Sequence, residues 1–414
     1  MIELRTPITV SEAVERVMAH ARELGAETVP LDESFGRIMA QPLKATHDVP
    51  PFDRSPYDGF AIRSEDSRGA SGASRKAFTV IGHYGAGAVF EGELGPMQAV
   101  RIMTGAALPS NADAVVMFEQ ASINGNSFMI RKEFAPLENL SLKGEDMAEG
   151  EMLAAPGSFI QPGIVALLAT FGYTDVKVAR RPVVGILSTG TELLDVHEPL
   201  SPGKIRNSNG PMIAAQLARM GISCRMYKTA GDELESCLDM VRQAMEECDC
   251  LITTGGVSVG DFDFLPAIYE RLGAKVLFNK VSMRPGSVTT VSVHSGKYLF
   301  GLSGNPSACY IGFELFTRPV LLKMMGATKP YLPRTTARLG ETLAKANPFT
   351  RFIRAVYDGS SVRSAGFNKS NAVSSIARGN ALMVLPGGSR HFAEGDTVDV
   401  LLLGVEEGTD CWII

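Results

Sequence analysis

The spacing of hydrophobic residues changes along the chain and divides it into segments that predict different secondary structure. From Arg181 to about residue 326, short apolar runs such as PVVGIL, CLITT and KYLFGL alternate with amphipathic stretches long enough for helices. This alternation is typical of a parallel sheet covered by helices on both faces. It predicts a central, doubly wound parallel α/β domain over 181–326.

The flanking regions follow other patterns. Thr9 and Glu12 form a capping box, which predicts a helix running to about Leu24. Residues 47–144 contain short β-branched runs separated by turns, with a hairpin predicted at Asn124-Gly125; a second hairpin is predicted at Asp358-Gly359, near the end of the chain. The predicted fold class is therefore multidomain α/β plus β. Its parts are an N-terminal mixed domain over 1–46 and 145–180 with an apolar helix at 163–171, an inserted β domain over 47–144, the α/β domain over 181–326, and a small C-terminal β domain over 327–414.

Composition and charge exclude several functional classes. The 414 residues carry a net charge of −5 without basic runs, so we expect no nucleic-acid partner and no binding to anionic membranes. The longest apolar stretch, residues 163–173, is too short to span a bilayer, and the first residues lack a signal-peptide pattern. The six cysteines form no CxxC pair, which favours reduced thiols and a cytoplasmic location.

Polar and glycine-rich segments follow four of the predicted strands. Ligands of open parallel sheets bind outside the carboxyl ends of the strands, so these segments form one candidate edge. Neither a Walker motif nor G-x-G-x-x-G fits the glycines, which argues against a P-loop NTPase and a nicotinamide enzyme. The candidate anion-binding residues at this edge are Thr189, Gly190, Gly255, Gly256, Ser258, Lys280, Arg284, Ser303, Asn305 and Pro306.

Acidic side chains converge on the same predicted edge. Glu192, Asp261 and Asp263 would repel a phosphate about 5 Å away by about 3 kcal/mol per charge pair at an effective dielectric of about 20. Mg²⁺ resolves this conflict, because it takes one or two carboxylates together with phosphate oxygens and waters. We therefore expect Mg²⁺ at this edge, with Glu192, Asp261 and Asp263 as its candidate ligands.

Simpler interpretations of these residues remain open. The glycines after Thr254 suit a tight strand-to-helix turn without any ligand, and Asp263 suits a helix N-cap. Isolated lysines and arginines such as Lys280 and Arg284 are more often solvated surface side chains than ligand contacts. A ligand site requires these acidic and basic side chains to lie together at the predicted strand-end edge, whereas the simpler interpretations do not.

Seven motifs together resemble the molybdopterin molybdenumtransferase family, which includes the C-terminal catalytic region of gephyrin. The motifs are PPFDRSPYDGFAIR, VRIMTGAALP, GEDM, ILSTGTEL, GGVSVGDFDF, MRPGS and SGNPSA, and they occur in the family's order over nearly the whole chain. The resemblance implies an elongated four-domain homodimer, in which the mixed domain dimerises. It also implies a site between the α/β domain of one subunit and the inserted β region of the other.

The reaction implied by this resemblance is the last step of molybdenum cofactor assembly. Molybdate is inserted into the dithiolene of adenylylated molybdopterin, with Mg²⁺-dependent release of AMP. Other cofactor-biosynthesis proteins and apo-molybdoenzymes are implied as partners. Matching family positions are Asp58, Thr104 and Asp146 in the inserted β region and its flank, Glu192, Asp232, Asp263, Lys280 and Arg284 in the α/β domain, and Ser374 or Ser375 in the C-terminal domain.

The roles implied for these residues follow their charges. Lys280 and Arg284 would bind molybdate or the pterin phosphate, and Glu192 and Asp263 would hold Mg²⁺ or orient water. Asp58 and Asp146 are candidates for proton handling or a second cation contact. Asp232 also fits a helix cap, because Glu235 follows three residues later.

The chain departs from the common family pattern at three places. Ser287 stands where many members have a lysine, and Ser303 stands in a segment that reads Leu-Pro-Gly-Asn-Pro in many members. Ser141-Leu142-Lys143 replaces an arginine cluster. The lost lysine leaves a non-catalytic scaffold as one alternative function. Adenylylation of molybdopterin is the second, since it uses a fold similar to residues 181–326, but it does not require the flanking domains.

Overall fold

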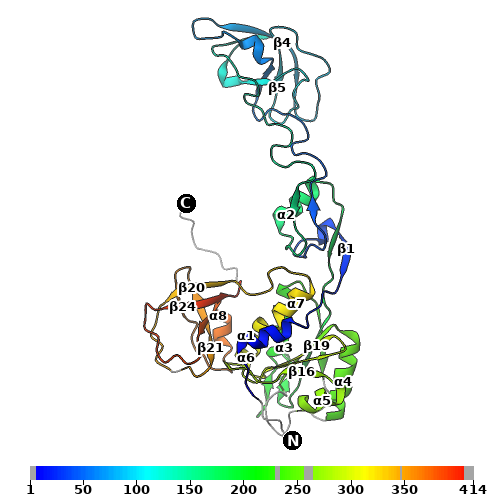
Figure 1. Ribbon diagram of the computed structural model, residues 1–414, viewed down its shortest axis with the longest axis vertical. Helices are drawn as coiled ribbons and strands as arrows, with labels where there is room; N and C mark the ends of the chain where they lie inside the picture. The colour runs from blue at the N-terminus through cyan, green and yellow to red at the C-terminus, as the bar shows by residue number, and fades with distance from the viewer. Residues whose placement is uncertain (1–5, 229–233, 256–263, 346, 405–414) are drawn as a thin grey trace. The chain divides into compact units, whose positions relative to one another are not determined.

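A computed structural model of the chain describes residues 6–228, 234–255, 264–345 and 347–404 (Figure 1). The described residues divide into two compact units. The first unit falls within Met1–Ala40, Pro156–Pro162 and Asp175–Ile414, and the second within Gln41–Ala155 and Gly163–Thr174. The predicted combination of a central α/β domain with β-rich flanking domains is confirmed, whereas the exact boundaries between the four domains stay a prediction.

The central sheet of the first unit has six strands in the order β14-β11-β15-β19-β18-β16. Four of them are parallel, as predicted: β11 (Val184–Ser188), β14 (Cys224–Lys228), β15 (Cys250–Thr254) and β19 (Lys297–Leu302). Strand β18 (Thr290–His294) was not predicted; it pairs antiparallel with both β19 and β16 (Lys275–Phe278). The sheet is therefore mixed, but β16 and β19 run in the same direction, so their carboxyl ends share one edge.

Helices cover both faces of this sheet. Successive strand residues point to opposite faces, and both sets of side chains are apolar. On one face, Ile186 and Ile252 belong to a core with α3 (Asn209–Arg219), α6 (Pro306–Gly312), the π-helical turn η4 (Phe313–Thr317) and α7 (Arg318–Met324). On the other face, Leu187 and Leu251 pack with α4 (Leu234–Glu247) and α5 (Leu265–Leu272).

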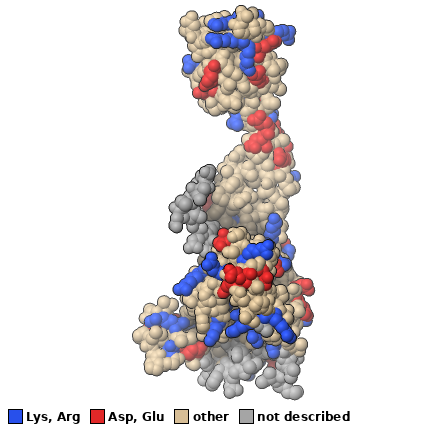
Figure 2. Space-filling model, turned by 90° about the vertical axis from the view of Figure 1, so that its left-hand side faces the viewer, with Lys and Arg blue, Asp and Glu red and all other residues tan. Residues whose placement is uncertain are grey.

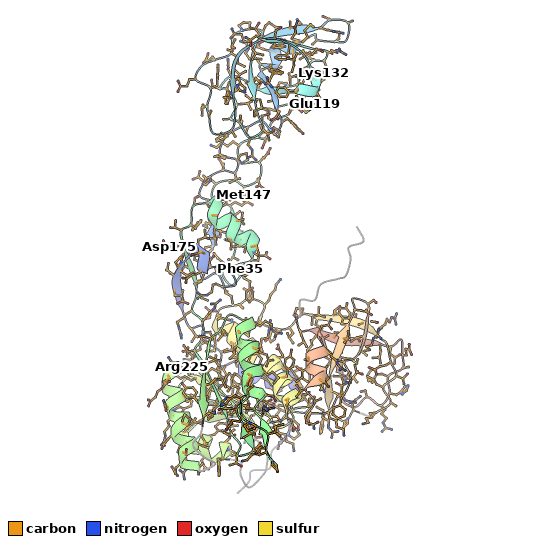
Figure 3. All side chains as sticks on the ribbon, turned by 180° about the vertical axis from the view of Figure 1, so that it is seen from behind. Phe35, Glu119, Lys132, Met147, Asp175 and Arg225 are labelled. Atoms are coloured by element: carbon orange, nitrogen blue, oxygen red, sulfur yellow. The ribbon has the colours of Figure 1, made fainter. Side chains whose placement is uncertain are left out.

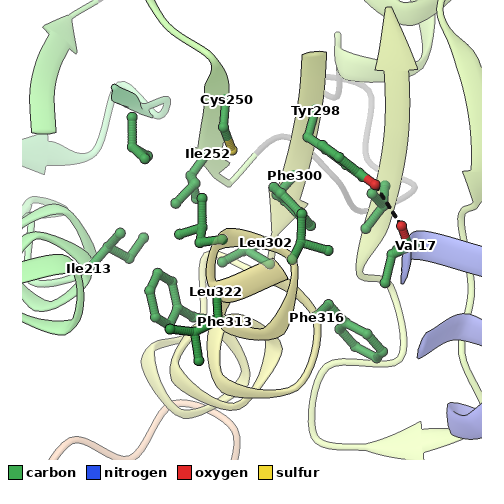
Figure 4. Close-up of a cluster of buried hydrophobic side chains, with 14 of the residues drawn as sticks. Val17, Ile213, Cys250, Ile252, Tyr298, Phe300, Leu302, Phe313, Phe316 and Leu322 are labelled. Atoms are coloured by element: carbon green, nitrogen blue, oxygen red, sulfur yellow. Dashed lines mark hydrogen bonds between the residues drawn. The ribbon is translucent and has the colours of Figure 1, made fainter. Parts of the chain in front are cut away.

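The N-terminal helix α1 (Val10–Met18) joins the first of these cores. Thr9 caps it by accepting the Glu12 N–H at 3.1 Å, and the Tyr298 hydroxyl donates to the Val17 carbonyl at 2.6 Å (Figure 4). The predicted cap is confirmed, but the predicted extension to Leu24 is wrong. The Leu24 N–H instead donates to the Met324 carbonyl at 3.0 Å, so a tertiary contact replaces the helical ladder.

The C-terminal part of the first unit is a small closed sheet with one added strand. The strands are β20 (Arg334–Leu339), β21 (Thr350–Tyr357), β22 (Ser361–Ser364), β23 (Ala381–Leu385) and β24 (Thr397–Leu402), with α8 (Ser374–Arg378) beside them. The hairpin predicted at Asp358-Gly359 is confirmed. The short strand β17 (Met283–Arg284), which comes from the α/β region, pairs with β21.

Small elements complete the first unit. Two antiparallel strands, β1 (Ala26–Pro30) and β10 (Asp175–Ala179), lie before and after the part of the chain that contains the second unit, and η1 (Leu31–Glu33) follows β1. A parallel pair, β12 (Leu193–Leu194) and β13 (Ile205–Arg206), extends from the central sheet region. At the outer strand β14, Arg225 pairs with Glu247 at 2.8 Å (Figure 3).

The second unit contains a six-stranded sheet in the order β6-β3-β5-β4-β8-β7. The hairpin predicted at Asn124-Gly125 is confirmed, and stacked Phe60 and Phe128 rings, 4.0 Å apart, form part of the core. The strands are β3 (Gly59–Ile62), β4 (Lys76–Tyr84), β5 (Gln98–Ile102), β6 (Ala114–Met117), β7 (Ala121–Asn124) and β8 (Ser127–Ile130), joined by η2 (Ser64–Ser67) and η3 (Phe118–Gln120).

A two-stranded pair, β2 (Leu43–Lys44) and β9 (Met152–Ala154), also lies in the second unit. The predicted apolar helix is α2 (Pro162–Thr170). Across the described residues, every helix is too short or too polar to cross a bilayer. Cys248, Cys250 and Cys309 are buried free thiols, as expected from the cysteine pattern.

Candidate functional site

The carboxyl ends of β11, β15 and β19 are joined by backbone hydrogen bonds. The Thr189 N–H donates to the Thr254 carbonyl at 3.1 Å, and the Gly255 N–H donates to the Leu302 carbonyl at 3.2 Å. Gly255 has a φ of +86°, and a Cβ at this position would lie 2.8 Å from the Thr189 carbonyl oxygen. Glycine is therefore required by both the backbone conformation and the close approach.

The turn after β19 lies against this glycine. A Cβ on Gly304 would be 3.6 Å from the Gly255 Cα. Ser303 is buried and its hydroxyl accepts the Asn305 N–H at 3.2 Å, while Asn305 is the N-cap and Pro306 the first residue of α6. The structure thus brings Gly255, Ser303, Asn305 and Pro306 together, as predicted for the strand-end edge.

A pocket of about 490 Å³ opens between this turn and the C-terminal sheet. Arg284 of β17 is the register partner of Arg351 of β21, so two arginines lie side by side. Arg284 also lies over the Phe349 ring, 5.7 Å from its centroid. The described lining contains four cationic residues and no acidic one; the lining residues used below are Arg284, Ser287, Ser303, Asn305, Lys345, Arg351, Lys369, Ser370 and Asn371.

A third guanidinium lies near the pocket, inside the C-terminal sheet. Arg354 is 1% exposed and donates to the Ser375 hydroxyl through Nε at 3.2 Å and Nη2 at 3.1 Å. It also donates to the carbonyl of Lys369 at 3.1 Å. Burial, together with the nearby charge of Arg351, lowers the pKa of Arg354 to about 10. The predicted residue Ser375 is fully buried, so its hydroxyl holds Arg354 instead of lining the pocket.

The remaining predicted residues of the α/β domain lie outside this lining. A Cβ on Gly190 would be 2.5 Å from Glu192 Oε2, so the Glu192 carboxylate folds back over Gly190. Lys280 is half-buried, and its carbonyl accepts the Ile8 N–H at 3.2 Å. Asp232, Gly256, Ser258, Asp261 and Asp263 lie outside the described residues. Within the described ranges, histidine, cysteine, aspartate and glutamate nowhere form a metal-binding group of three or more.

In the second unit, the structure joins two of the predicted residues directly. Asp58 accepts the Thr104 N–H at 2.7 Å and its hydroxyl at 2.9 Å. These two hydrogen bonds lower the pKa of the exposed Asp58 carboxyl. Arg101, which also lowers that pKa, lies over the Phe118 ring at 4.8 Å. Asp146 donates its N–H to the Val49 carbonyl at 3.0 Å, and no described hydrogen bond joins it to Asp58.

Charges elsewhere on the surface are mixed. Figure 2 shows lysine and arginine side chains interspersed with aspartate and glutamate on the face in view. The cationic lining of the pocket therefore contrasts with the protein's overall charge of −5. This contrast marks the pocket as the described feature best suited to a small anion.

Sequence comparison covers almost the entire chain. Residues 8–172 match the MoeA N-terminal region (domain I and II), 185–323 match a probable molybdopterin binding domain, and 336–403 match the MoeA C-terminal region (domain IV). A molybdopterin molybdenumtransferase of Staphylococcus epidermidis is 55% identical over 405 residues, covering 97% of both chains. The chain belongs to the molybdopterin molybdenumtransferase family. It is therefore a transferase.

Further relatives agree with this family membership. A molybdopterin molybdenumtransferase of Staphylococcus aureus is 54% identical over 406 residues, again covering 97% of both chains. The crystal structure of a molybdopterin biosynthesis MoeA protein from Pyrococcus horikoshii matches with a TM-score of 0.84 and 30% identity, covering 97% of this chain and all of the other. A molybdenum cofactor biosynthesis protein from Pyrococcus furiosus, with a TM-score of 0.61 and 19% identity, shares the fold.

Several residues in and near the pocket were not predicted from the sequence. Arg351, which lines the pocket, and Arg354, which lies near it, are on a strand about 70 residues after Arg284, and only the pairing of β17 with β21 brings them close to Arg284. Lys345 and Lys369 lie on loops that carry no recognisable motif. They add positive charge to the same lining as Ser287, the position where the expected lysine is missing.

Proposed function

We propose that this transferase inserts molybdenum into molybdopterin during synthesis of the molybdenum cofactor. The name of relatives that are 55% identical over nearly the full length supports this proposal. The match of residues 185–323 to a probable molybdopterin binding domain supports the choice of substrate. The observation that carries the proposal is the acid-free cationic pocket formed by Arg284, Arg351 and the two lysines at the strand-end edge.

Molybdate is the ligand proposed for this pocket. It is a tetrahedral dianion, and guanidinium groups offer a fixed fork of donors that suits such an oxyanion. Arg284 and Arg351 repel each other when no anion is present; a pair of unit charges about 5 Å apart interacts with about 3 kcal/mol at an effective dielectric of about 20. A dianion between them reverses the sign of this interaction. Arg354 adds a further positive charge near the pocket.

The full proposed substrate is adenylylated molybdopterin, and the proposed by-product is AMP. Mg²⁺ would be held by Glu192 together with Asp261 and Asp263. Glu192 fits this role because its carboxylate, a hard oxygen ligand, forms no ion pair with any described residue. When bound, Mg²⁺ supplies charge neutralisation at the pyrophosphate, whose cleavage depends mainly on positioning and electrostatics. Lys280 is proposed to bind a phosphate oxygen.

The proposed active form is a cytoplasmic homodimer. In it, Asp58, Thr104 and Asp146 of one subunit would complete the α/β site of the other. The large exposed side chains Phe35, at 62%, and Phe159, at 47%, are consistent with a face covered by another subunit. Apo-molybdoenzymes and other cofactor-biosynthesis proteins are the proposed partners after the reaction.

Reconstitution from purified components tests the proposed function. The protein is supplied with adenylylated molybdopterin, Mg²⁺ and molybdate, and we expect AMP release together with a pterin that activates an apo-molybdoenzyme. A parallel sample with ATP and unmodified molybdopterin tests the adenylyltransferase alternative. Failure to activate the apo-enzyme, with a known insertase working in the same assay, would rule out the proposal. The Glu192→Gln variant should lose the Mg²⁺-dependent step, whereas unchanged turnover would exclude Glu192 as a ligand.

A further inference from the structure

Buried polar side chains form a seam between α3 and the helical segment from Pro306 to Met324. Asn209, Gln216 and Glu314 are 7%, 4% and 2% exposed, and they lie between helices whose other contacts are apolar. Gln216 donates to Glu314 Oε1 at 2.8 Å, and Arg219 donates to the same oxygen at 2.6 Å. Asn209, at the first position of α3, is the member of the seam nearest to the strand-end edge.

The Asn209 side chain is not used to cap its own helix. Asn207 serves that purpose, since its Oδ1 accepts the Gly210 N–H at 3.0 Å. Asn209 Nδ2 instead donates to the Gly304 carbonyl at 2.8 Å. Its Oδ1 is buried and has no hydrogen-bond partner among the described residues. Gln216 Oε1 is likewise buried and without a partner among the described residues, so what distinguishes Asn209 is its hydrogen bond to the Gly304 carbonyl.

The turn held by Asn209 leads directly into the pocket. Ser303 and Asn305, on either side of Gly304, both line it. Two residues further on, the Ser307 N–H donates to the Ser370 carbonyl at 3.0 Å, and the Ser307 hydroxyl donates to the Ala372 carbonyl at 2.6 Å. The turn is therefore connected to the loop that carries Lys369, a cationic residue of the pocket.

We propose that Asn209 is a positioning residue for oxyanion binding. Its hydrogen bond to the Gly304 carbonyl fixes the Ser303–Asn305 turn and, through Ser307, the loop of Lys369. The assignment of molybdate as the oxyanion rests on the proposed function, whereas the placement of the turn does not. A small displacement of a preorganised binding group weakens binding because the group must then be ordered by the ligand.

Gln216 supplies a matched control. It is also a buried amide of α3 in the same seam, but its partners are Glu314 and the Tyr310 carbonyl, away from the turn. Gln216→Leu and Asn209→Leu each remove one buried amide from the same helix pair. If Asn209 acts only through stability, both variants should behave alike. If it positions the turn, only Asn209→Leu should change the pocket.

Two measurements on the full-length protein test this proposal. Hydrogen exchange of backbone amides in peptides covering 303–309 and 369–373 should accelerate in Asn209→Leu and stay near wild type in Gln216→Leu. Calorimetric titration with molybdate should show about tenfold weaker binding for Asn209→Leu and little change for Gln216→Leu. Asn209→Asp, which keeps the shape but presents an acceptor to the Gly304 carbonyl, replaces the leucine variant if that variant does not fold.

The outcomes separate this proposal from the proposed function. Unchanged exchange at 303–309, or equal loss of molybdate affinity in the Asn209 and Gln216 variants, would overturn the role of Asn209. If wild-type protein binds no molybdate but exchange still accelerates selectively, the positioning role stands and the oxyanion assignment fails.

Discussion

Arg284 and Arg351 occupy partnered positions on the parallel strands β17 and β21. Burial, with the neighbouring charge of Arg284, lowers the pKa of Arg351. The pairing of these strands brings a segment of the α/β domain and a strand of the C-terminal sheet to the same pocket. The described lining of this pocket contains no acidic residue that could neutralise Arg284 and Arg351. Repulsion between the two arginines therefore lowers the stability of the fold when no anion is bound, and it favours binding of an anion.

Replacing Arg351 should separate binding from stability. We expect Arg351→Met to weaken molybdate binding by at least about tenfold, because it removes a charge-assisted donor. Thermal unfolding without molybdate should change little, since repulsion from Arg284 is also removed. In wild-type protein, molybdate at about 100 times its Kd should stabilise the fold by about 2.7 kcal/mol. Arg334→Met is the control, because Arg334 is exposed and pairs with Asp399 at 2.9 Å in the same sheet.

Gly255 should tolerate no side chain. Gly255→Ala combines a φ of +86° with a contact of 2.8 Å to the Thr189 carbonyl oxygen, whereas Gly296→Ala has a φ of +78° and open space around the new Cβ. Both variants carry backbone strain of about 1–3 kcal/mol. Any further loss of unfolding free energy in Gly255→Ala relative to Gly296→Ala measures the cost of the close contact with the Thr189 carbonyl oxygen. Denaturant unfolding measures the difference. Equal stabilities would show that the strand ends can move apart without cost.

Removing either partner of the Arg219–Glu314 ion pair should lower the free energy of unfolding, but by different amounts. The Glu314 side chain is 0% exposed and that of Arg219 is 35% exposed, with 2.6 Å between their charged atoms. Arg219→Met leaves a buried carboxylate without its nearest cation and should cost about 3 kcal/mol. Glu314→Met should cost less, because the freed Arg219 guanidinium can turn towards water and Arg318, 3.9 Å from the other carboxylate oxygen, keeps its hydrogen bond to the Pro330 carbonyl. Urea unfolding of both variants checks the order, and the opposite order would contradict this explanation.

Thr104 should control the titration of Asp58. Its N–H and hydroxyl lower the Asp58 pKa, so Thr104→Val, which keeps only the N–H, should raise that pKa part of the way back. Because the folded pKa lies below the unfolded one, the stabilisation is present above the unfolded pKa and is lost as pH falls through the folded pKa. NMR titration of the Asp58 carboxyl carbon measures the shift, with Thr104→Ser as the control. Identical midpoints in Thr104→Val and wild type would show that the hydroxyl has no effect.

Much of the α/β domain was predictable because its signals are local. The runs that became β11, β15 and β19 are apolar on both faces, and the glycine and proline residues after them mark the ligand edge. Strand β18 was missed although Ser295-Gly296 separates two β-branched or apolar runs, a pattern that also suits a hairpin. An antiparallel inner strand such as β18, which pairs with both β19 and β16, gives no apolar signal distinct from that of the parallel strands.

The cationic pocket was predictable only in part. Arg284, Ser303 and Asn305 were found from their positions after strands, but Arg351 and Lys369 join them through a strand pairing over a long sequence separation. Ser375 was predicted as a ligand-binding residue, yet its buried hydroxyl accepts a hydrogen bond from Arg354. Sequence patterns indicate which strand ends carry chemistry; they do not indicate which distant strand pairs with them.

Anomalous diffraction from crystals grown with molybdate tests the central claim most directly. Data collected at the molybdenum absorption edge locate the metal without reference to the protein's conformation. We expect one strong molybdenum peak in the pocket lined by Arg284, Asn305 and Arg351, and its loss in Arg351→Met crystals. A peak at another site, or one that persists at full height in Arg351→Met, would contradict the assignment of this pocket.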